Sequence, residues 1–390
     1  MPVHPAFQQS RIIPVDAARG LVMLMVFLAH IKQHFEVSAP TLHWWLLSTT
    51  RIATPTFLLL SGFVVRLLLR TDTRGKTSVM LIDRGLFLLT VGHVLLGLDN
   101  YSQMSFTDWM FNRIGPVEAI GFGLCIAVLL RNRSARECAA FGIGVFAMAW
   151  MLEMSAIRRN IWVSSSDLPL AELNTAVDAL NGTELLNEVG IFLIGVALGA
   201  RLHIESTARD YAFIGRRLFF FGAAAVLSTL GGIIAWHFVK DDVMQLASPE
   251  IGGVVRRTLD PRMKDPPSPG YLLFYGGAGL IVVSIFFRSL SNRFVQGTAN
   301  ITSVIGRASL MCFIVQDWLF FGVPHALGLD TIRSIPFWFA YLAVCIALLF
   351  WLAHWWGRIR GNRFLTVGLK YLDRQGKLPL SRWRTPDLNA

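Results

Sequence analysis

Charged residues are scarce in this chain. Only 16% of its 390 residues are Asp, Glu, Lys or Arg, whereas 54% are hydrophobic, and the mean hydropathy is +0.51. Soluble domains usually carry about a quarter charged residues, and the core of a soluble domain does not need so much apolar surface. The composition therefore argues against a soluble protein and favours an integral membrane protein.

Cysteine is scarce too, and the features that divide a chain into domains are missing. The 4 cysteines form no CxxC pair and no Cys/His metal spacing, so we expect small buried side chains and no metal site. We find no Pro- or Ser-rich linker, no low-complexity tract and no repeat of fixed period. Residues 1–390 are therefore expected to form a single transmembrane domain.

A concentrated basic face is also absent, although the net charge is +11. The basic residues are spread over short loops and the C-terminal tail, and they are not interleaved with stacking aromatic side chains. This distribution argues against a nucleic-acid partner. In a membrane protein, an excess of Lys and Arg marks the cytoplasmic side instead.

What the sequence has in abundance is apolar stretches of roughly 20 residues, the length that a helix needs to cross the bilayer. They predict an all-α, polytopic membrane bundle of about ten transmembrane helices. Longer hydrophilic outer loops are expected at about 155–184 and 239–269, and a tail at about 358–390. The predicted spans are approximately 17–36, 52–70, 79–98, 115–131, 137–154, 185–202, 213–238, 270–288, 299–323 and 334–357.

The basic residues also orient this bundle. With the N-terminus inside, the cytoplasmic segments contain 25 of the 36 Lys and Arg residues, while the acidic residues are more frequent in the outer segments. This bias predicts that both termini are cytoplasmic.

The first span carries polar residues on one face. Arg19 and His30 are eleven residues apart, about three helical turns, so both project from the same face, roughly 16 Å apart along the axis. Asp16 lies three residues before Arg19 and is placed to pair with it. Ionisable side chains inside a bilayer are costly and indicate a functional site. The structural alternative is that Arg19 snorkels to the interface and His30 hydrogen-bonds a neighbouring helix.

Three segments resemble a known superfamily, the transmembrane acyltransferases. It includes the acyltransferase-3 proteins, the periplasmic glucan succinyltransferases and the heparan-glucosaminide N-acetyltransferase-like proteins. Residues 11–30 (RIIPVDAARGLVMLMVFLAH) resemble its first span, 54–57 (TPTF) with 60–63 (LSGF) its second, and 306–310 (GRASL) a late one. One position departs, because acyltransferase-3 members often have a His where this chain has Gln316.

The resemblance implies an enzyme of the cell (inner) membrane. It would move an acyl group, acetyl or succinyl, from a cytoplasmic acyl-CoA to a hydroxyl or amine of a cell-envelope glycan. His30 would be either the general base or a covalent acyl carrier. Arg19, on the donor side, suits the phosphates of CoA because guanidinium binds phosphate through paired hydrogen bonds. Acyl-CoA is thus the expected co-substrate, no metal is expected, and a homo-oligomer is left open.

Other polar residues are assigned roles around this pair. Asp317, at about the depth of His30, either orients the imidazole or only bonds another helix. Arg66 and Arg84 either join Arg19 and Asp16 in binding the donor or only anchor the topology. Contacts to the acceptor are assigned to Arg51, Glu118 and Gln316, whereas His93 is expected to be structural.

A secondary transporter or exporter of a glycan or small metabolite is the alternative function, since intramembrane charges also line transport paths. Transporters often contain inverted repeats with broken helices at matched positions, and this sequence shows no such symmetry. The acyltransferase interpretation is therefore preferred.

Overall fold

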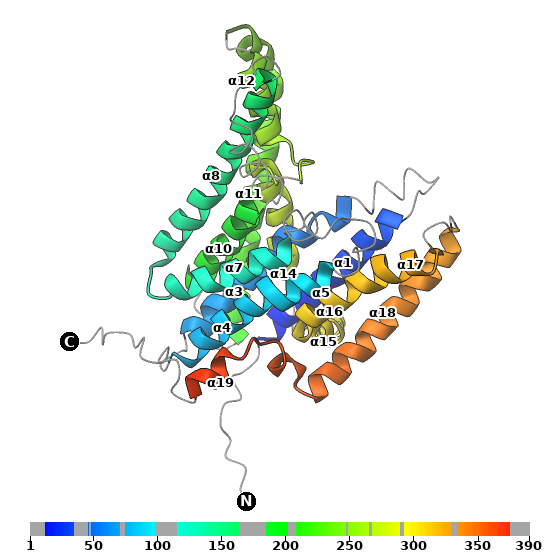
Figure 1. Cartoon of the computed structure of the whole chain (residues 1–390). Coiled ribbons are helices and arrows are strands. Elements are labelled where there is room, and N and C mark those ends of the chain that lie inside the picture. Colours follow the sequence, from blue (N-terminus) through cyan, green and yellow to red (C-terminus); the bar gives the residue numbers. More distant parts are fainter. Residues whose placement is uncertain are drawn as a thin grey trace, which may run out of the picture.

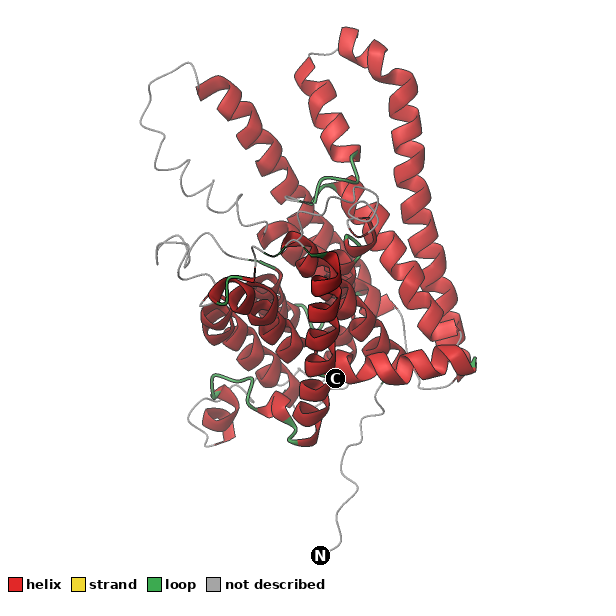
Figure 2. Cartoon of the chain, turned by 90° about the vertical axis from the view of Figure 1, so that its right-hand side faces the viewer, coloured by secondary structure: helices red, strands yellow, loops and turns green. Residues whose placement is uncertain are grey.

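The computed structural model describes residues 12–34, 46, 48–70, 75–97, 115–163, 185–201, 208–246, 249–264, 267–288, 292–329, 332 and 334–374. Within these ranges the regular elements are all helices, and none is a strand (Figure 2). The predicted all-α fold is confirmed for this part of the chain.

The helices occur along the chain in the following order. The N-terminal half contains α1 (Ile13–His34), α3 (Ala53–Arg70), α4 (Lys76–Phe87), the π-helical turn η1 (Leu88–Gly92), α5 (His93–Gly97), α7 (Pro116–Leu129), α8 (Ala135–Val163) and α10 (Leu185–Arg201). The C-terminal half contains α11 (Ala208–Leu246), α12 (Pro249–Leu259), α13 (Pro269–Tyr271), η3 (Leu272–Gly276), α14 (Gly277–Arg288), α15 (Arg293–Arg307), α16 (Ser309–Asp317), η4 (Trp318–Gly322), α17 (Val323–Ala326), α18 (Ile335–Arg358), η6 (Gly361–Arg363) and α19 (Leu369–Arg374).

Several of these helices have the length and composition of membrane spans, as expected for a multi-pass membrane protein. Each coincides with one predicted span. Among the described residues there are 7 such segments: Ile13–His30, Ser48–Arg70, Lys76–Gly97, Ala135–Met154, Tyr211–Asp242, Pro269–Arg288 and Ile335–Arg358.

The other three predicted spans are helical but shorter or broken. α7 has 14 residues and α10 has 17, whereas a crossing helix needs about 20. The predicted span 299–323 is not one straight helix, because Arg293–Arg307 and Ser309–Ala326 meet at an angle of 69°. The prediction of a continuous ninth helix is therefore corrected, and the break falls at Ala308.

The two predicted outer loops are also partly helical. α8 runs to Val163, into the predicted loop 155–184, and the rest of that loop lies outside the described residues. In the predicted loop 239–269, α11 continues to Leu246 and α12 follows. Low hydropathy indicated that these residues leave the lipid, but a helix with a polar face is stable outside lipid as well.

An arm built from α8, α11 and α12 projects from the bundle (Figure 1). α11 has 39 residues, which at 1.5 Å per residue is about 58 Å, roughly twice the thickness of the hydrocarbon core. Within the arm, Nε1 of Trp150 in α8 donates to Oγ1 of Thr258 in α12 at 3.0 Å. The arm thus extends past the length that a bilayer would cover.

Close helix crossings hold the centre of the bundle. A Cβ atom on Gly20 of α1 would lie 1.8 Å from a backbone oxygen of α15, and one on Gly306 of α15 would lie 1.8 Å from the carbonyl oxygen of Asp16. Between α3 and α10, a Cβ atom on Gly62 would lie 2.0 Å from the carbonyl oxygen of Phe192. Small residues permit such contact between helix backbones, which packs membrane helices together.

The start of the predicted tail is attached to α4. Asp83 is buried, and its Oδ1 accepts hydrogen bonds from the backbone N–H groups of Val367 and Leu369 at 3.1 and 3.0 Å. The hydroxyl of Thr366 donates to the other oxygen of the same carboxylate. The segment that leads into α19 is therefore fixed beside Arg84, the next residue of α4.

Candidate functional site

Arg19 projects from α1 into the junction of three helices. Its Nη2 donates to Oγ of Ser309, the first residue of α16, at 2.7 Å. Its guanidinium carbon lies 5.8 Å from the centre of the Phe57 ring of α3, a cation–π distance. Its Nε is shut off from solvent and has no hydrogen-bond partner among the described residues. A buried donor left unsatisfied costs about 1–3 kcal/mol, which favours binding of an external acceptor here.

The groups around Arg19 carry charges of both signs. Asp16 is near enough to attract Arg19, in line with the pairing expected from their spacing. Arg84 of α4 is near enough to repel Arg19, and it makes no hydrogen bond to a described residue. Asp83 attracts Arg84 and also accepts hydrogen bonds from the C-terminal segment. The junction thus holds two guanidinium groups that repel each other, and an anionic ligand bound near both would reduce this repulsion.

The backbone explains why Arg19 reaches Ser309. The glycine contacts press α1 against α15, and the 69° break at Ala308 redirects the chain so that Ser309 begins a new helix opposite Arg19. The break leaves the carbonyl of Arg307 outside a continuous helix, and Nδ2 of Asn362 donates to this carbonyl at 3.2 Å. The bend is thus stabilised from the C-terminal segment.

His30 lies farther along the same helix and contacts the same broken segment. Its Nδ1 is 2.8 Å from Oε1 of Gln316, and its ring packs edge-on against Phe321, with the ring centres 4.9 Å apart. Gln316 is the last residue but one of α16, and Phe321 lies in η4. A π-helical turn brings residues five apart nearer to one face than an α-helix does, which lets both residues face His30. Such turns are frequent at functional sites.

Asp317 is partly buried at the end of α16, next to Gln316. The sequence predicts that Asp317 either orients the imidazole of His30 or only bonds another helix, and that Gln316 contacts the acceptor. The residue in contact with Nδ1 is Gln316. The role of Asp317 stays a prediction.

A second buried pair connects α5 and α7. Nδ1 of His93 lies 2.9 Å from Oε1 of Glu118, and both side chains are buried. The other carboxylate oxygen of Glu118 accepts a hydrogen bond from the backbone N–H of Gly115 at 2.8 Å, which caps α7. These contacts fit the structural role expected for His93. The contact of Glu118 with an acceptor stays a prediction.

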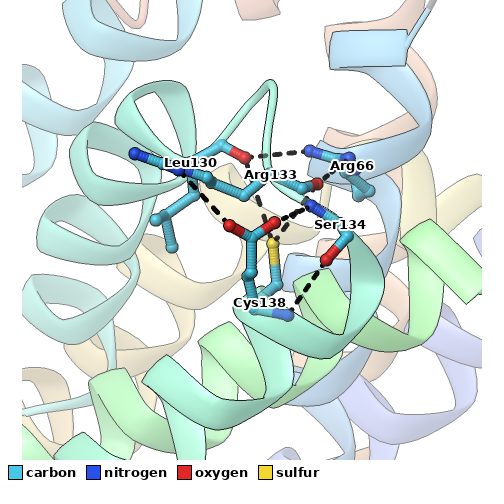
Figure 3. Close-up of polar contacts among 6 residues, drawn as sticks. Arg66, Leu130, Arg133, Ser134 and Cys138 are labelled. Atoms are coloured by element: carbon cyan, nitrogen blue, oxygen red, sulfur yellow. Dashed lines mark hydrogen bonds and ion pairs between the residues drawn. The ribbon is translucent and has the colours of Figure 1, made fainter.

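Arg66 belongs to α3, and its side chain reaches the turn between α7 and α8 (Figure 3). Its Nη1 donates to the carbonyl oxygens of Leu130 and Arg131 at 3.1 and 2.6 Å, and its Nη2 donates to that of Arg133 at 2.7 Å. Arg66 thereby fixes the turn that follows α7 by donating to three of its carbonyl oxygens. These contacts support the structural interpretation of Arg66 over the donor-binding one.

Arg51 precedes α3, where its carbonyl oxygen accepts a hydrogen bond from the hydroxyl of Tyr271 at 2.9 Å. This contact ties the start of α3 to α13. The contact of the Arg51 side chain with an acceptor stays a prediction.

Sequence reasoning missed Ser309 and Phe57 as partners of Arg19. Both residues belong to the segments that carry the resemblance, so the signal was present, but spacing along one helix cannot show which other helix lies opposite. It also missed the three π-helical turns, of which η1 directly precedes His93 and η4 directly follows Asp317.

Comparisons with protein-family models, curated proteins and solved structures find no match to this chain. Among the described residues, no group of three or more His, Cys, Asp and Glu side chains is placed to hold a metal ion. The cysteines are all free, and Cys138, Cys312 and Cys345 are buried, as expected for small packing residues.

Proposed function

We propose that this chain is a membrane acyltransferase, which transfers an acyl group from a cytoplasmic acyl-CoA to a hydroxyl or amine of a cell-envelope glycan. One observation carries the proposal. The three segments that resemble transmembrane acyltransferases, far apart in the sequence, meet around one face of α1. Arg19 contacts Phe57 and Ser309, and the Phe57 ring stacks on that of Phe313 at 6.2 Å between centres.

In the proposed site, the phosphates of the acyl donor bind at Arg19, near Arg84. A CoA phosphate would supply the acceptor that Nε of Arg19 lacks, and its charge would relieve the repulsion between Arg19 and Arg84. The separation of Arg19 and His30 along α1, roughly 16 Å, suits a pantetheine arm that carries the thioester toward the imidazole.

The residue proposed to take part in acyl transfer is His30. In the direct mechanism, the imidazole takes the proton of the acceptor hydroxyl or amine while that oxygen or nitrogen attacks the thioester carbonyl. The C–S bond then breaks, and the sulfur leaves as a thiolate that takes a proton from the imidazolium. In the alternative mechanism, the imidazole of His30 attacks the thioester carbonyl first, the C–S bond breaks and the CoA thiolate leaves. The acceptor then attacks the acyl group on His30, its proton goes to the thiolate, and the bond between the acyl carbon and the imidazole breaks.

The proposed topology is ten spans with both termini cytoplasmic in the cell (inner) membrane. The seven long helices support most of it, and α7, α10 and the bent pair α15–α16 would be the remaining crossings. Reporters fused at Asp260 and at Asp387 should lie on opposite sides of the membrane. The same side for both would contradict this topology.

Purified protein in detergent, given labelled acyl-CoA and envelope glycan, tests the enzyme against the transporter. Acyl-CoA-dependent labelling of the glycan, or of His30, supports the enzyme. Absence of both, with flux of glycan or metabolite across liposomes that contain the protein, contradicts the enzyme and supports a transporter.

A further inference from the structure

Gln316 is completely buried, and only one of the two polar atoms of its side-chain amide has a hydrogen-bond partner among the described residues. Its side chain has 0% exposure. Its Oε1 lies against Nδ1 of His30 at 2.8 Å, whereas its Nε2 is buried and has no hydrogen-bond partner among the described residues. A primary amide has two N–H donors to satisfy, and leaving a buried donor unpaired is costly. A side chain that merely tied α16 to α1 would not need this unused donor.

The bonded end of the amide determines the state of the imidazole. A carbonyl oxygen can only accept, so Nδ1 of His30 must donate and carry the ring proton. In the neutral ring, the lone pair then lies on Nε2, the nitrogen away from Gln316. This is the form that can take a proton from an acceptor or attack a carbonyl.

The unused end of the amide suits a carbonyl oxygen of the ligand. Charge develops on the thioester oxygen during acyl transfer, and fixed N–H donors in a water-poor site stabilise it. The Nε2 group belongs to the same side chain that holds His30, so it stays near the imidazole.

We infer that Gln316 acts with both ends of its amide: Oε1 holds His30 in the Nδ1–H tautomer, and Nε2 donates a hydrogen bond to the carbonyl oxygen of the bound acyl group. Gln316 is then a positioning residue through Oε1 and a catalytic residue through Nε2. This inference rests on the proposed acyltransferase function and specifies how its site binds the thioester.

Gln316→Met is the variant that tests it. Methionine matches the length and flexibility of glutamine but has no N–H donor. Gln296→Met is the matched control, since Gln296 is an exposed residue of α15. Removal of one such donor typically lowers kcat by about 10²–10³-fold, and we expect this loss in Gln316→Met with little change in KM for acyl-CoA. The control should transfer at the wild-type rate, and melting temperatures show whether each variant is folded.

A measurement that does not depend on turnover uses acetyl-CoA labelled with ¹³C at the carbonyl. In infrared difference spectra, a hydrogen bond lowers the stretching frequency of the bound carbonyl. We expect this lowered band in the wild type, in Gln296→Met and in His30→Gln, and its return toward the value of the free thioester in Gln316→Met.

The tautomer is read by ¹⁵N NMR of histidine-labelled protein, with His30→Gln to assign the signal. We expect protonated Nδ1 and unprotonated Nε2 at His30 in the wild type, and loss of this single form in Gln316→Met. The opposite tautomer in the wild type, or an unshifted carbonyl band, overturns the inference.

The same experiments separate this inference from the proposed function. Wild-type transfer that depends on His30 but persists at full kcat in folded Gln316→Met overturns only the role of Gln316. Absence of transfer and of acyl-CoA binding in the wild type overturns both.

Discussion

At the scale of single residues, this protein keeps polar groups in places where they are costly. Nε of Arg19 and Nε2 of Gln316 are both buried donors without a partner among the described residues. Arg19 lies at one end of a face of α1, near Arg84, whereas Gln316 of α16 contacts His30 at the other end of that face. Packing would be served better by apolar side chains, so the unused donors are more easily explained by a ligand that spans both ends.

Arg19→Ala should weaken acyl-CoA binding more than glycan binding, because it removes the cation and the unsatisfied donor at the donor end. Loss of a charged hydrogen bond costs about 1.5–3 kcal/mol, which corresponds to roughly a 10–100-fold rise in Kd. Isothermal titration with CoA and with acyl-CoA measures this. Unchanged donor affinity in the folded variant would mean that Arg19 serves only the contact with Ser309.

His30→Gln should lower turnover by about 10²–10⁴-fold, the usual contribution of a general base. Glutamine keeps the ability to hydrogen-bond Gln316 but cannot take the proton of the acceptor. His93→Gln is the comparison, because His93 is paired with Glu118 and is assigned no chemical role. If His30→Gln transfers acyl groups at nearly the wild-type rate, His30 serves only packing and the proposed chemical role is wrong.

At the scale of helices, the site depends on the contact of α1 with the broken pair α15–α16. The glycine crossing sets the distance between α1 and α15, and the break at Ala308 directs Ser309 and Gln316 toward α1. Nothing in the sequence predicted this break. No proline marks it, and the predicted span 299–323 runs across it.

Gly306→Ala should separate α1 from α15, since the new Cβ atom would meet the carbonyl oxygen of Asp16 at 1.8 Å. We expect a loss of stability of about 1–3 kcal/mol and weaker acyl-CoA binding. Gly297→Ala in the same helix is the control, because a Cβ atom there meets nothing within 4 Å and alanine favours helix. Equal melting temperatures for the two variants would contradict the close crossing.

Arg66→Met should lower stability and leave acyl-CoA affinity unchanged. The guanidinium holds three carbonyl oxygens in the turn between α7 and α8, and its loss leaves them without these donors. We expect a cost of about 1–3 kcal/mol in thermal or denaturant unfolding. A weaker affinity for acyl-CoA at unchanged stability would instead support the donor-binding role that the sequence left open.

At the scale of the whole molecule, composition and hydropathy predicted the all-helical membrane fold and the positions of the helices. Hydropathy is a property of local sequence, and so it locates segments that favour lipid. It did not predict that α11 and α12 continue as an arm, because helices outside lipid need no apolar run. Nor did it predict the partners of Arg19 and His30, which depend on contacts between segments nearly 300 residues apart.

We propose that this chain acylates an envelope glycan through His30. Mass spectrometry of envelope glycans tests it most directly, in cells that carry the wild-type protein, the His30→Gln variant at equal expression, or no protein. We expect the mass of the glycan to increase by that of one acyl group in cells with the wild-type protein, and in neither of the other two. Identical glycan profiles in all three, or acylation that persists with His30→Gln, would contradict it.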